Sequence, residues 1–247
     1  MRIATYNVNG INGRLTNLLD WLQEVRPDIA CLQEVRAPGE KFPTAAIRAA
    51  GYSAAWQGEK GWNGVAILAR DGEPTVTRRA LPGDPDDRHS RYIEAAVNGV
   101  IVGCLYLPNG NLAPGPKFDY KLRWFERLSE HAGHLLASGA PTVLAGDYNV
   151  MPTDIDVYAP ERLVDDALFR PEVRKAYRRP SAVIGSAAED LMVCRLFCGG
   201  RWIRTIGPPV TCELCWRGLP LLLARERQRF SFLRASNHSV EPGWGTV

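Results

Sequence analysis

The stretch Val143-Leu144-Ala145-Gly146-Asp147-Tyr148-Asn149-Val150 is an apolar run that stops on the pattern Gly-Asp-x-Asn. Such a run predicts a buried strand that presents polar side chains at its exposed end. Asp147 and Asn149 are two residues apart, so on an extended chain they point the same way. A carboxylate can take or give a proton, and an amide can donate or accept hydrogen bonds. The same pair is typical of a turn that closes a strand, so partners elsewhere in the chain decide between a turn and a functional site.

The composition is that of an ordinary globular protein. The chain has 247 residues, of which 45% are hydrophobic and 23% charged, so one large domain or two small ones can bury a substantial core. The net charge of +3 is too small to indicate a partner. No apolar run approaches the roughly 20 residues of a membrane span, and the first residues already form an alternating strand. We therefore expect a cytoplasmic protein with no signal peptide and no contact with a membrane.

Predicted strands and helices alternate along the chain, and hairpins interrupt the alternation. Leucines recur at helical spacing from Leu15 to Val25, before Pro27, and a long amphipathic helix is predicted from about Lys117 to Ala137. Asn98-Gly99 separates two strand-like runs and is the strongest short signal for a hairpin. This mixture predicts an α/β fold with mixed sheets instead of a purely parallel sheet.

Polar side chains stand at the ends of four predicted strands, namely Asn7, Glu34, Tyr106 and the pair Asp147 and Asn149. Strand ends of one sheet cluster in space, and sites are built at that edge. Carboxylates with amides, and no set of His and Cys, suit a hard cation such as Mg²⁺ or Mn²⁺. A metal with few protein ligands leaves positions open for a phosphate oxygen and water, which indicates phosphodiester chemistry. The alternative is that each residue only satisfies local backbone groups in a loop.

Five ordered segments carry a resemblance to a known family: Ile3–Ile11, Asp28–Arg36, Gly61–Ile67, Tyr106–Gly110 and Ala145–Asn149. Over about residues 1–179 the sequence resembles the exonuclease III branch of the endonuclease/exonuclease/phosphatase superfamily. The resemblance implies a four-layer α/β sandwich, with two mixed sheets face to face and helices outside. It also implies Mg²⁺-dependent cleavage of double-stranded DNA, by 3′→5′ removal of nucleotides and by incision at abasic sites. We expect such a protein to be a monomer.

The resemblance also implies a role for each strand-end residue. Glu34 would bind the metal with Asn7 beside it, and Asp147 and Asn149 would lie near the same ion. Asp147 would orient or deprotonate the attacking water, while Asn149 would hydrogen-bond the phosphate and help to fix that water. Tyr106 would act as a phenol at the scissile phosphate.

Further residues are candidates for contact with DNA, either as charges on the phosphate backbone or as polar groups in the motif loops. Backbone contacts by basic residues would make binding sensitive to salt. For each basic residue the alternative is a solvated surface charge. The candidates are Arg36, Lys60, Asn63, Asn109, Lys117 and Lys121.

The resemblance stops after Arg179. The family continues with an aromatic loop that enters the DNA groove, an Arg-Ile-Asp strand and a terminal Ser-Asp-His motif whose Asp and His complete the site. Residues 181–247 lack these features, and the nearest echo, Ser236-Asn237-His238, has Asn in place of the carboxylate. His238 is thus a candidate phosphate contact or a surface histidine. We expect an incomplete nuclease domain over residues 1–179, with strand edges partly uncovered, and an atypical tail over residues 180–247 from a frameshifted or foreign reading frame.

Alternatives remain open for the tail and for the function. Cys194-x₃-Cys198 and Cys212-x₂-Cys215 have nearly the spacing of zinc ligands, so a zinc knuckle is the second interpretation of the tail. Groups that act as a unit are non-additive, so without the terminal Asp and His we expect little or no nuclease activity. The other functions considered are a catalytically inactive DNA-binding remnant and a phosphodiesterase of the same fold acting on a lipid or nucleotide head group.

Overall fold

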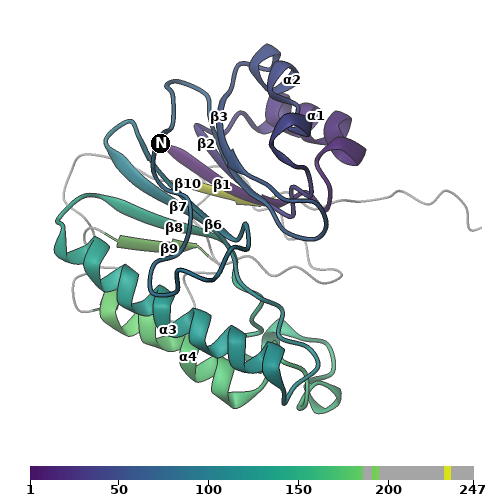
Figure 1. Ribbon diagram of the computed structural model, residues 1–247, viewed down its shortest axis with the longest axis vertical. Coiled ribbons are helices and arrows are strands. Elements are labelled where there is room, and N and C mark those ends of the chain that lie inside the picture. The colour runs from purple at the N-terminus through teal and green to yellow at the C-terminus, as the bar shows by residue number, and fades with distance from the viewer. Residues whose placement is uncertain (186–190, 195–230, 235–247) are drawn as a thin grey trace, which may run out of the picture.

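Two five-stranded β-sheets pack face to face in the computed structural model, which describes residues 1–185, 191–194 and 231–234. Figure 1 shows four layers, with α1 and α2 outside one sheet and α3 and α4 outside the other. The strand order is β10-β1-β2-β4-β3 in the first sheet and β5-β6-β7-β8-β9 in the second. Both sheets contain parallel and antiparallel pairs. The predicted four-layer sandwich is confirmed.

The elements have the following bounds. The first sheet contains β1 (Arg2–Asn7), β2 (Ile29–Gln33), β3 (Ser53–Gln57), β4 (Val65–Ala69) and β10 (Ser231–Arg234). The second contains β5 (Thr75–Arg78), β6 (Tyr92–Val97), β7 (Val100–Tyr106), β8 (Thr142–Asp147) and β9 (Leu191–Cys194). The helices are α1 (Leu15–Val25), α2 (Thr44–Ala49), α3 (Pro116–Ala137) and α4 (Pro171–Gly185).

Three buried cores hold the layers together. Ile3 and Val102 belong to the core between the two sheets. Leu18 of α1 packs beneath the first sheet, and Leu128 of α3 packs beneath the second. Because both faces of each sheet are covered, the central strands are buried along almost their whole length, and this explains why they appear in the sequence as nearly continuous apolar runs.

Local sequence signals predict several elements correctly. Helix α1 has its predicted bounds, and Arg26 follows it in the left-handed conformation, at φ +48°, before Pro27. β6 and β7 form the antiparallel hairpin predicted at Asn98-Gly99. Helix α3 begins one residue before the predicted Lys117. These elements depend on periodicity and turn chemistry, which short stretches of sequence carry.

Two local features differ from expectation. The sequence does not predict β5, because Thr75–Arg78 has one apolar residue and three exposed side chains, and the strand exists through its pairing with β6. Helix α4 begins at Pro171 and continues past Arg179 to Gly185. It therefore crosses the point at which the family motifs end in the sequence.

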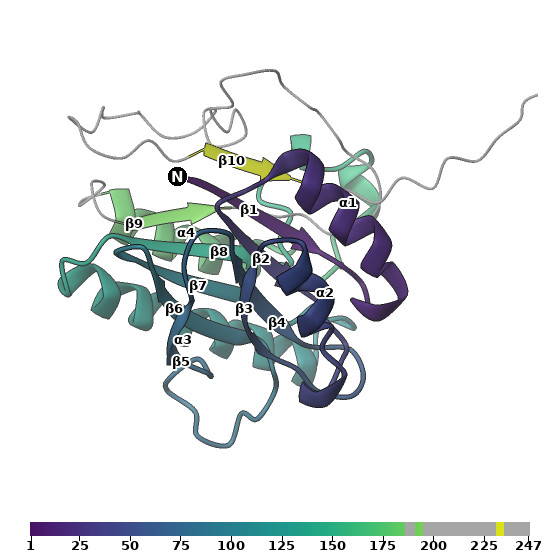
Figure 2. The same cartoon turned by 90° about the horizontal axis from the view of Figure 1, so that it is seen from above.

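The short strands β9 and β10 come from the tail, and each is an outer strand of its sheet. β9 pairs in parallel with β8, and β10 pairs in parallel with β1. Figure 2 shows each of them at the outer side of its sheet. The expectation that strand edges stay uncovered is wrong for β1 and β8, because these parallel neighbours take up their free backbone groups. The division of the chain at residue 179 stays a prediction.

Glu94 is the centre of a buried polar cluster that joins β5, β6 and α3. Its carboxylate accepts hydrogen bonds from Thr77 Oγ1 at 2.7 Å and from Tyr92 OH at 2.8 Å, and its Oε2 lies 2.7 Å from His131 Nε2. Burial alone would raise the pKa of Glu94, but the hydrogen bonds from His131, Thr77 and Tyr92 outweigh burial and lower the pKa to about 2. The ionised carboxylate is thus the form that the fold favours.

We expect Glu94→Gln to lower the free energy of unfolding by about 3 kcal/mol at pH 7. The folded pKa lies below the ordinary value of 4.5, so the stabilisation is complete above that pH and is lost as pH falls toward 2. Urea denaturation across this range measures the effect. The control is Glu130→Gln, because Glu130 is exposed on α3, next to His131, and makes no part of the Glu94 cluster. A difference between Glu94→Gln and the parent that does not shrink with falling pH would contradict the argument.

Candidate active site

Side chains from both sheets meet at one edge of the sandwich. Asn7 is the last residue of β1 and Asp147 the last residue of β8, while Glu34 directly follows β2. Asn7 Nδ2 donates to Glu34 Oε1 at 2.8 Å and to Asp147 Oδ2 at 3.2 Å. One amide therefore joins the two carboxylates across the sheets. The predicted clustering of these strand ends is confirmed as geometry.

Tyr106 joins the cluster from the end of β7, where it pairs in register with Asp147. Its hydroxyl donates to Glu34 Oε1 at 3.1 Å. Burial raises the pKa of Tyr106, and the negative charges of Glu34 and Asp147 raise it further. The phenol is therefore protonated at neutral pH and available as a hydrogen-bond donor.

Glu34 lies in a tight connection after β2. Its φ is +53°, in the left-handed region that a residue other than glycine seldom adopts. The next segment packs closely against it: a Cβ at Gly64, where φ is +116°, would lie 2.9 Å from Val35 Cβ. Arg36 N donates to Asn63 O at 2.9 Å. The segments around Glu34 and Asn63 therefore hold each other in place through a backbone hydrogen bond and close packing.

The Gly146-Asp147-Tyr148-Asn149 segment is both a turn and a part of this cluster. Asn149 N donates to Asp147 Oδ1 at 2.9 Å, which is the local contact expected of an Asx turn. Asn149 Nδ2 donates to Leu107 O at 2.7 Å. A Cβ on Gly146 would lie 1.9 Å from Leu105 O, so the close approach of β7 requires glycine. Asp147 and Asn149 therefore form a turn and also belong to the cluster of candidate site residues.

The strand end that carries Asp147 is buried, and the expectation of an exposed end is wrong. Asp147 is 0% exposed and Asn149 is 4% exposed. Burial raises the pKa of Asp147 to about 7, although hydrogen bonds from Asn149 N and Asn7 oppose the shift. A carboxyl that titrates near neutrality can both accept and release a proton.

The donor set at this edge fits a hard divalent cation. Glu34 and Asp147 offer carboxylate oxygens that already share one amide donor, and a cation beside them would offset their mutual repulsion. Within the ranges that the structure describes, no three His, Cys, Asp or Glu side chains gather as a metal cage. Mg²⁺ keeps several waters and takes one or two protein carboxylates, so two carboxylates suffice.

The DNA-contact candidates lie in different environments, which the sequence does not reveal. Arg36 pairs with Glu34 and is half-buried. Asn63 is buried, and its Nδ2 bonds Glu59 and lies 3.4 Å from His89 Nδ1. Three other candidates are exposed: Lys60, Asn109 and Lys117.

Lys121 requires a correction, because it is not a surface charge. It is 0% exposed, and its Nζ donates to Asn109 O at 2.9 Å and to Asn149 O at 2.6 Å. Burial lowers its pKa to about 7, against the opposing charges of Asp147 and Asp166. The prediction that Lys121 contacts a DNA phosphate directly is therefore wrong.

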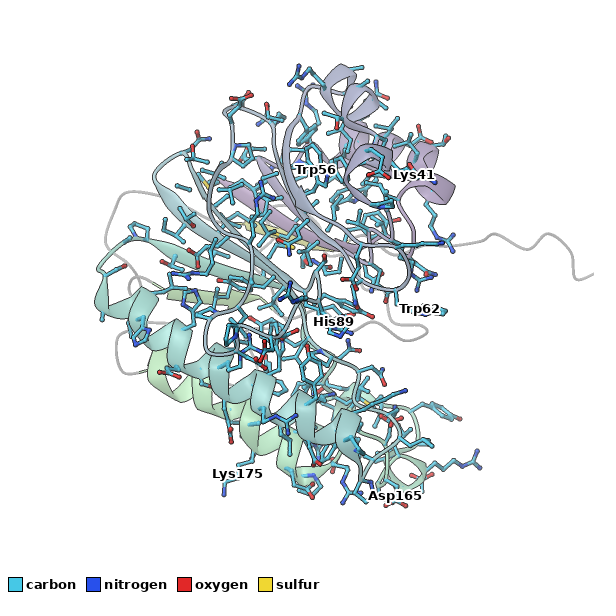
Figure 3. The ribbon with its side chains drawn as sticks, viewed as in Figure 1. Lys41, Trp56, Trp62, His89, Asp165 and Lys175 are labelled. Atoms are coloured by element: carbon cyan, nitrogen blue, oxygen red, sulfur yellow. The ribbon has the colours of Figure 1, made fainter. Side chains whose placement is uncertain are left out.

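Sequence reasoning misses two groups next to the site. Trp62 is 73% exposed, and the Arg36 guanidinium lies 4.6 Å from the centre of its ring. Arg91 lies 4.9 Å from the Tyr106 ring centre and donates to Tyr106 O at 3.3 Å. Figure 3 shows Trp62 at the right of the view, at about the same height as His89. Trp62 lies inside the Gly61–Ile67 motif, and this position is the signal that could identify it. Arg91 lies outside the five motifs and reaches Tyr106 only through the tertiary structure.

The tail candidates cannot be placed in this site. His238, Cys198, Cys212 and Cys215 lie outside the described residues, while Cys194 is the last residue of β9. A role for His238 at the phosphate and a zinc knuckle in the tail therefore stay predictions.

A family model described as the Endonuclease/Exonuclease/phosphatase family matches residues 4–217, and the chain belongs to this family. The match continues past Arg179. Within the family, the chain falls in the branch of exonuclease III and the AP endonucleases.

Relatives and solved structures agree with this placement. Exodeoxyribonuclease III of Haemophilus influenzae is 31% identical over 163 residues, which cover 64% of this chain and 60% of that enzyme. A DNA repair nuclease of Danio rerio is 30% identical over 72% of this chain and 58% of its own length. This chain therefore aligns with less than two thirds of either relative.

Solved structures show the same arrangement. An AP endonuclease from Archaeoglobus fulgidus superposes with a TM-score of 0.69 at 38% identity, over 73% of this chain and 70% of its own. A Neisseria 3′ phosphatase bound to a product DNA hairpin superposes with a TM-score of 0.70 at 37% identity, with the same coverage.

A search of the helices in the described ranges finds none that is both long and apolar enough to cross a membrane.

Proposed function

We propose that this edge of the sandwich is a Mg²⁺-dependent phosphodiesterase site for double-stranded DNA, of the exodeoxyribonuclease III type. Abasic sites and 3′ ends are the proposed points of cleavage, and Mn²⁺ is the proposed substitute ion. The single observation that carries the proposal is the pair of carboxylates, Glu34 and Asp147, joined across two sheets by Asn7. The Neisseria neighbour was solved with a DNA hairpin, which supports DNA as the polymer. We also propose that the protein acts as a monomer.

The residues divide the work of hydrolysis as their environments suggest. Glu34, with Asp147 and the amide oxygen of Asn7, would hold the cation, which supplies charge neutralisation on the phosphate oxygens. Asp147, oriented by Asn7 Nδ2 and Asn149 N, would orient the attacking water and take its proton. Tyr106, kept protonated by burial and nearby charge, would donate a hydrogen bond to the phosphate. Asn149 would hydrogen-bond the phosphate or the attacking water.

Basic residues at the same edge would bind the DNA backbone. Lys117 and Lys60 are exposed, and Arg36 and Trp62 form a stacked pair beside Glu34. Contacts of this kind release counterions, so binding should weaken as salt concentration rises. Asn63 and Asn109 would contribute to DNA binding indirectly, by fixing the conformation of the loops in which they lie.

We expect Glu34→Gln to lower the single-turnover rate on an abasic-site duplex by at least about 10³-fold, because groups that act as a unit fail together. The assay uses enzyme in excess, with Mg²⁺ and with EDTA. The control is Glu40→Gln, because Glu40 is exposed on the short turn Gly39–Lys41. Equal rates for Glu34→Gln and the parent, or cleavage that EDTA leaves unchanged, would contradict the proposal.

A second candidate function is a DNA-binding remnant without catalysis. It is favoured by one observation, which is that residues 181–247 contain no Ser-Asp-His motif. The same assay separates the two functions: slow cleavage that Glu34→Gln abolishes supports the nuclease, whereas duplex binding without any cleavage supports the remnant. A DNA with a 3′-terminal phosphate tests the activity named for the Neisseria neighbour.

A further inference from the structure

Lys121 connects helix α3 to the two loops that carry the candidate site. It is among the largest fully buried side chains of the described residues, and its stem runs inside the protein instead of over its surface. Its Nζ donates to Asn109 O at 2.9 Å and to Asn149 O at 2.6 Å. A buried side chain with both contacts on backbone carbonyls cannot act by touching DNA.

The two carbonyls belong to the loops that leave β7 and β8. These strands are parallel neighbours, and their last residues, Tyr106 and Asp147, are paired in register. Asn109 lies three residues after Tyr106, and Asn149 lies two residues after Asp147. Lys121 Nζ therefore joins the two loops directly beyond the side chains proposed to act on the phosphate.

The neighbouring backbone packs closely around the Lys121 side chain. Gly110, at φ +87°, packs on the stem so closely that a Cβ there would lie 2.7 Å from Lys121 Cδ. Asn149 has φ +47°, in the left-handed region that asparagine adopts more readily than other residues with a side chain. Removing the donor would leave two carbonyls without a partner in a place from which water is excluded.

We propose that Lys121 is a positioning residue, which fixes the loops after β7 and β8 relative to each other and so holds the Asn149 side chain in its working orientation. This inference rests on the proposed function. The expected consequence is a loss of rate with little change in DNA binding, because Lys121 acts on the geometry of Asn149 and not on the substrate.

The test compares Lys121→Met with Leu128→Ala in the full chain. Methionine keeps the stem and removes the donors, whereas Leu128 is buried on the same helix in the core beneath the second sheet. With an abasic-site duplex and excess enzyme, Lys121→Met should lower the maximal single-turnover rate by about 100-fold, with half-saturation changed by less than about threefold. Leu128→Ala should stay within about twofold of the parent in both quantities.

Amide hydrogen exchange gives a readout that does not need catalysis. In Lys121→Met the Asn149 amide should exchange about 10-fold faster, while Cys104 and Ala145 inside the strands stay unchanged. Leu128→Ala should not show this local pattern. If Lys121→Met does not fold, Lys121→Gln, which keeps two donors on a shorter stem, is measured in the same way.

The outcomes separate the two proposals. If the parent chain does not cleave DNA, the proposed function fails and exchange at Asn149 alone decides the role of Lys121. Unchanged exchange at Asn149 overturns the positioning role. It is also overturned if Leu128→Ala loses as much rate as Lys121→Met, or if the loss appears in half-saturation only.

Discussion

Asp147→Asn should lower the single-turnover rate on an abasic-site duplex by about 10²–10⁴-fold, because it removes the group that takes the proton from water. The replacement has nearly the same shape and can still accept a hydrogen bond from Asn149 N at Oδ1. The control is Asp165→Asn, because Asp165 has 91% of its side chain exposed and Figure 3 shows it far from His89, in the loop beyond β8. A loss of less than about tenfold would contradict the proposed role of Asp147.

The stability of Asp147→Asn separates a chemical defect from misfolding. The folded pKa of about 7 lies above the ordinary value of 3.8, so ionisation of Asp147 costs stability as pH rises between these values. Without divalent cations at pH 8, the variant should therefore be more stable than the parent, by up to a few kcal/mol less the cost of the hydrogen bond from Asn7 Nδ2, which the amide nitrogen cannot accept. Urea denaturation with EDTA measures this. A variant that is less stable and less active would indicate simple damage to the fold.

Replacing residues 180–247 with the corresponding segment of the Haemophilus influenzae enzyme should raise the single-turnover rate by at least about 10³-fold. The family resemblance implies that this segment supplies an Asp and a His that complete the site, and residues 181–247 contain no such motif. In the proposed function the terminal groups would act together with Glu34 and Asp147, so we expect a large effect from adding them.

The matched control is the same chimera with the grafted histidine changed to alanine, which should return to the rate of the parent chain. Both chimeras share one fold and one tail, so their difference measures the histidine and not the stability of the graft. Equal rates for the chimera and the parent would show that the tail does not limit catalysis. Rapid cleavage by the parent alone would contradict the expectation of little activity.

How much the sequence predicts depends on whether the signal is local. Helix α1 and the hairpin of β6 and β7 follow from side-chain periodicity and from Asn98-Gly99, and the structure has both. β5 escapes prediction because only its pairing with β6 makes it a strand. Residues such as Asn7 and Glu34 could be selected because each ends an apolar run, which needs no knowledge of the fold.

Lys117 and Lys121 show what a sequence leaves undetermined. They are four residues apart on α3 and appear equivalent as basic residues, yet Lys117 is exposed and Lys121 is 0% exposed. Burial depends on which loops cover the helix, and those loops come from β7 and β8.

The sequence by itself determined the family motifs, the order of most helices and strands up to α4, and the chemical types that can bind a metal and a phosphate. It could do so because each of these is written in short, local patterns. Only the tertiary structure decided that Asn7 joins Glu34 to Asp147, that Asp147 is buried with a pKa near 7, and that Lys121 faces inward. These properties arise where two sheets and two loops meet, so they depend on contacts between residues far apart in the chain.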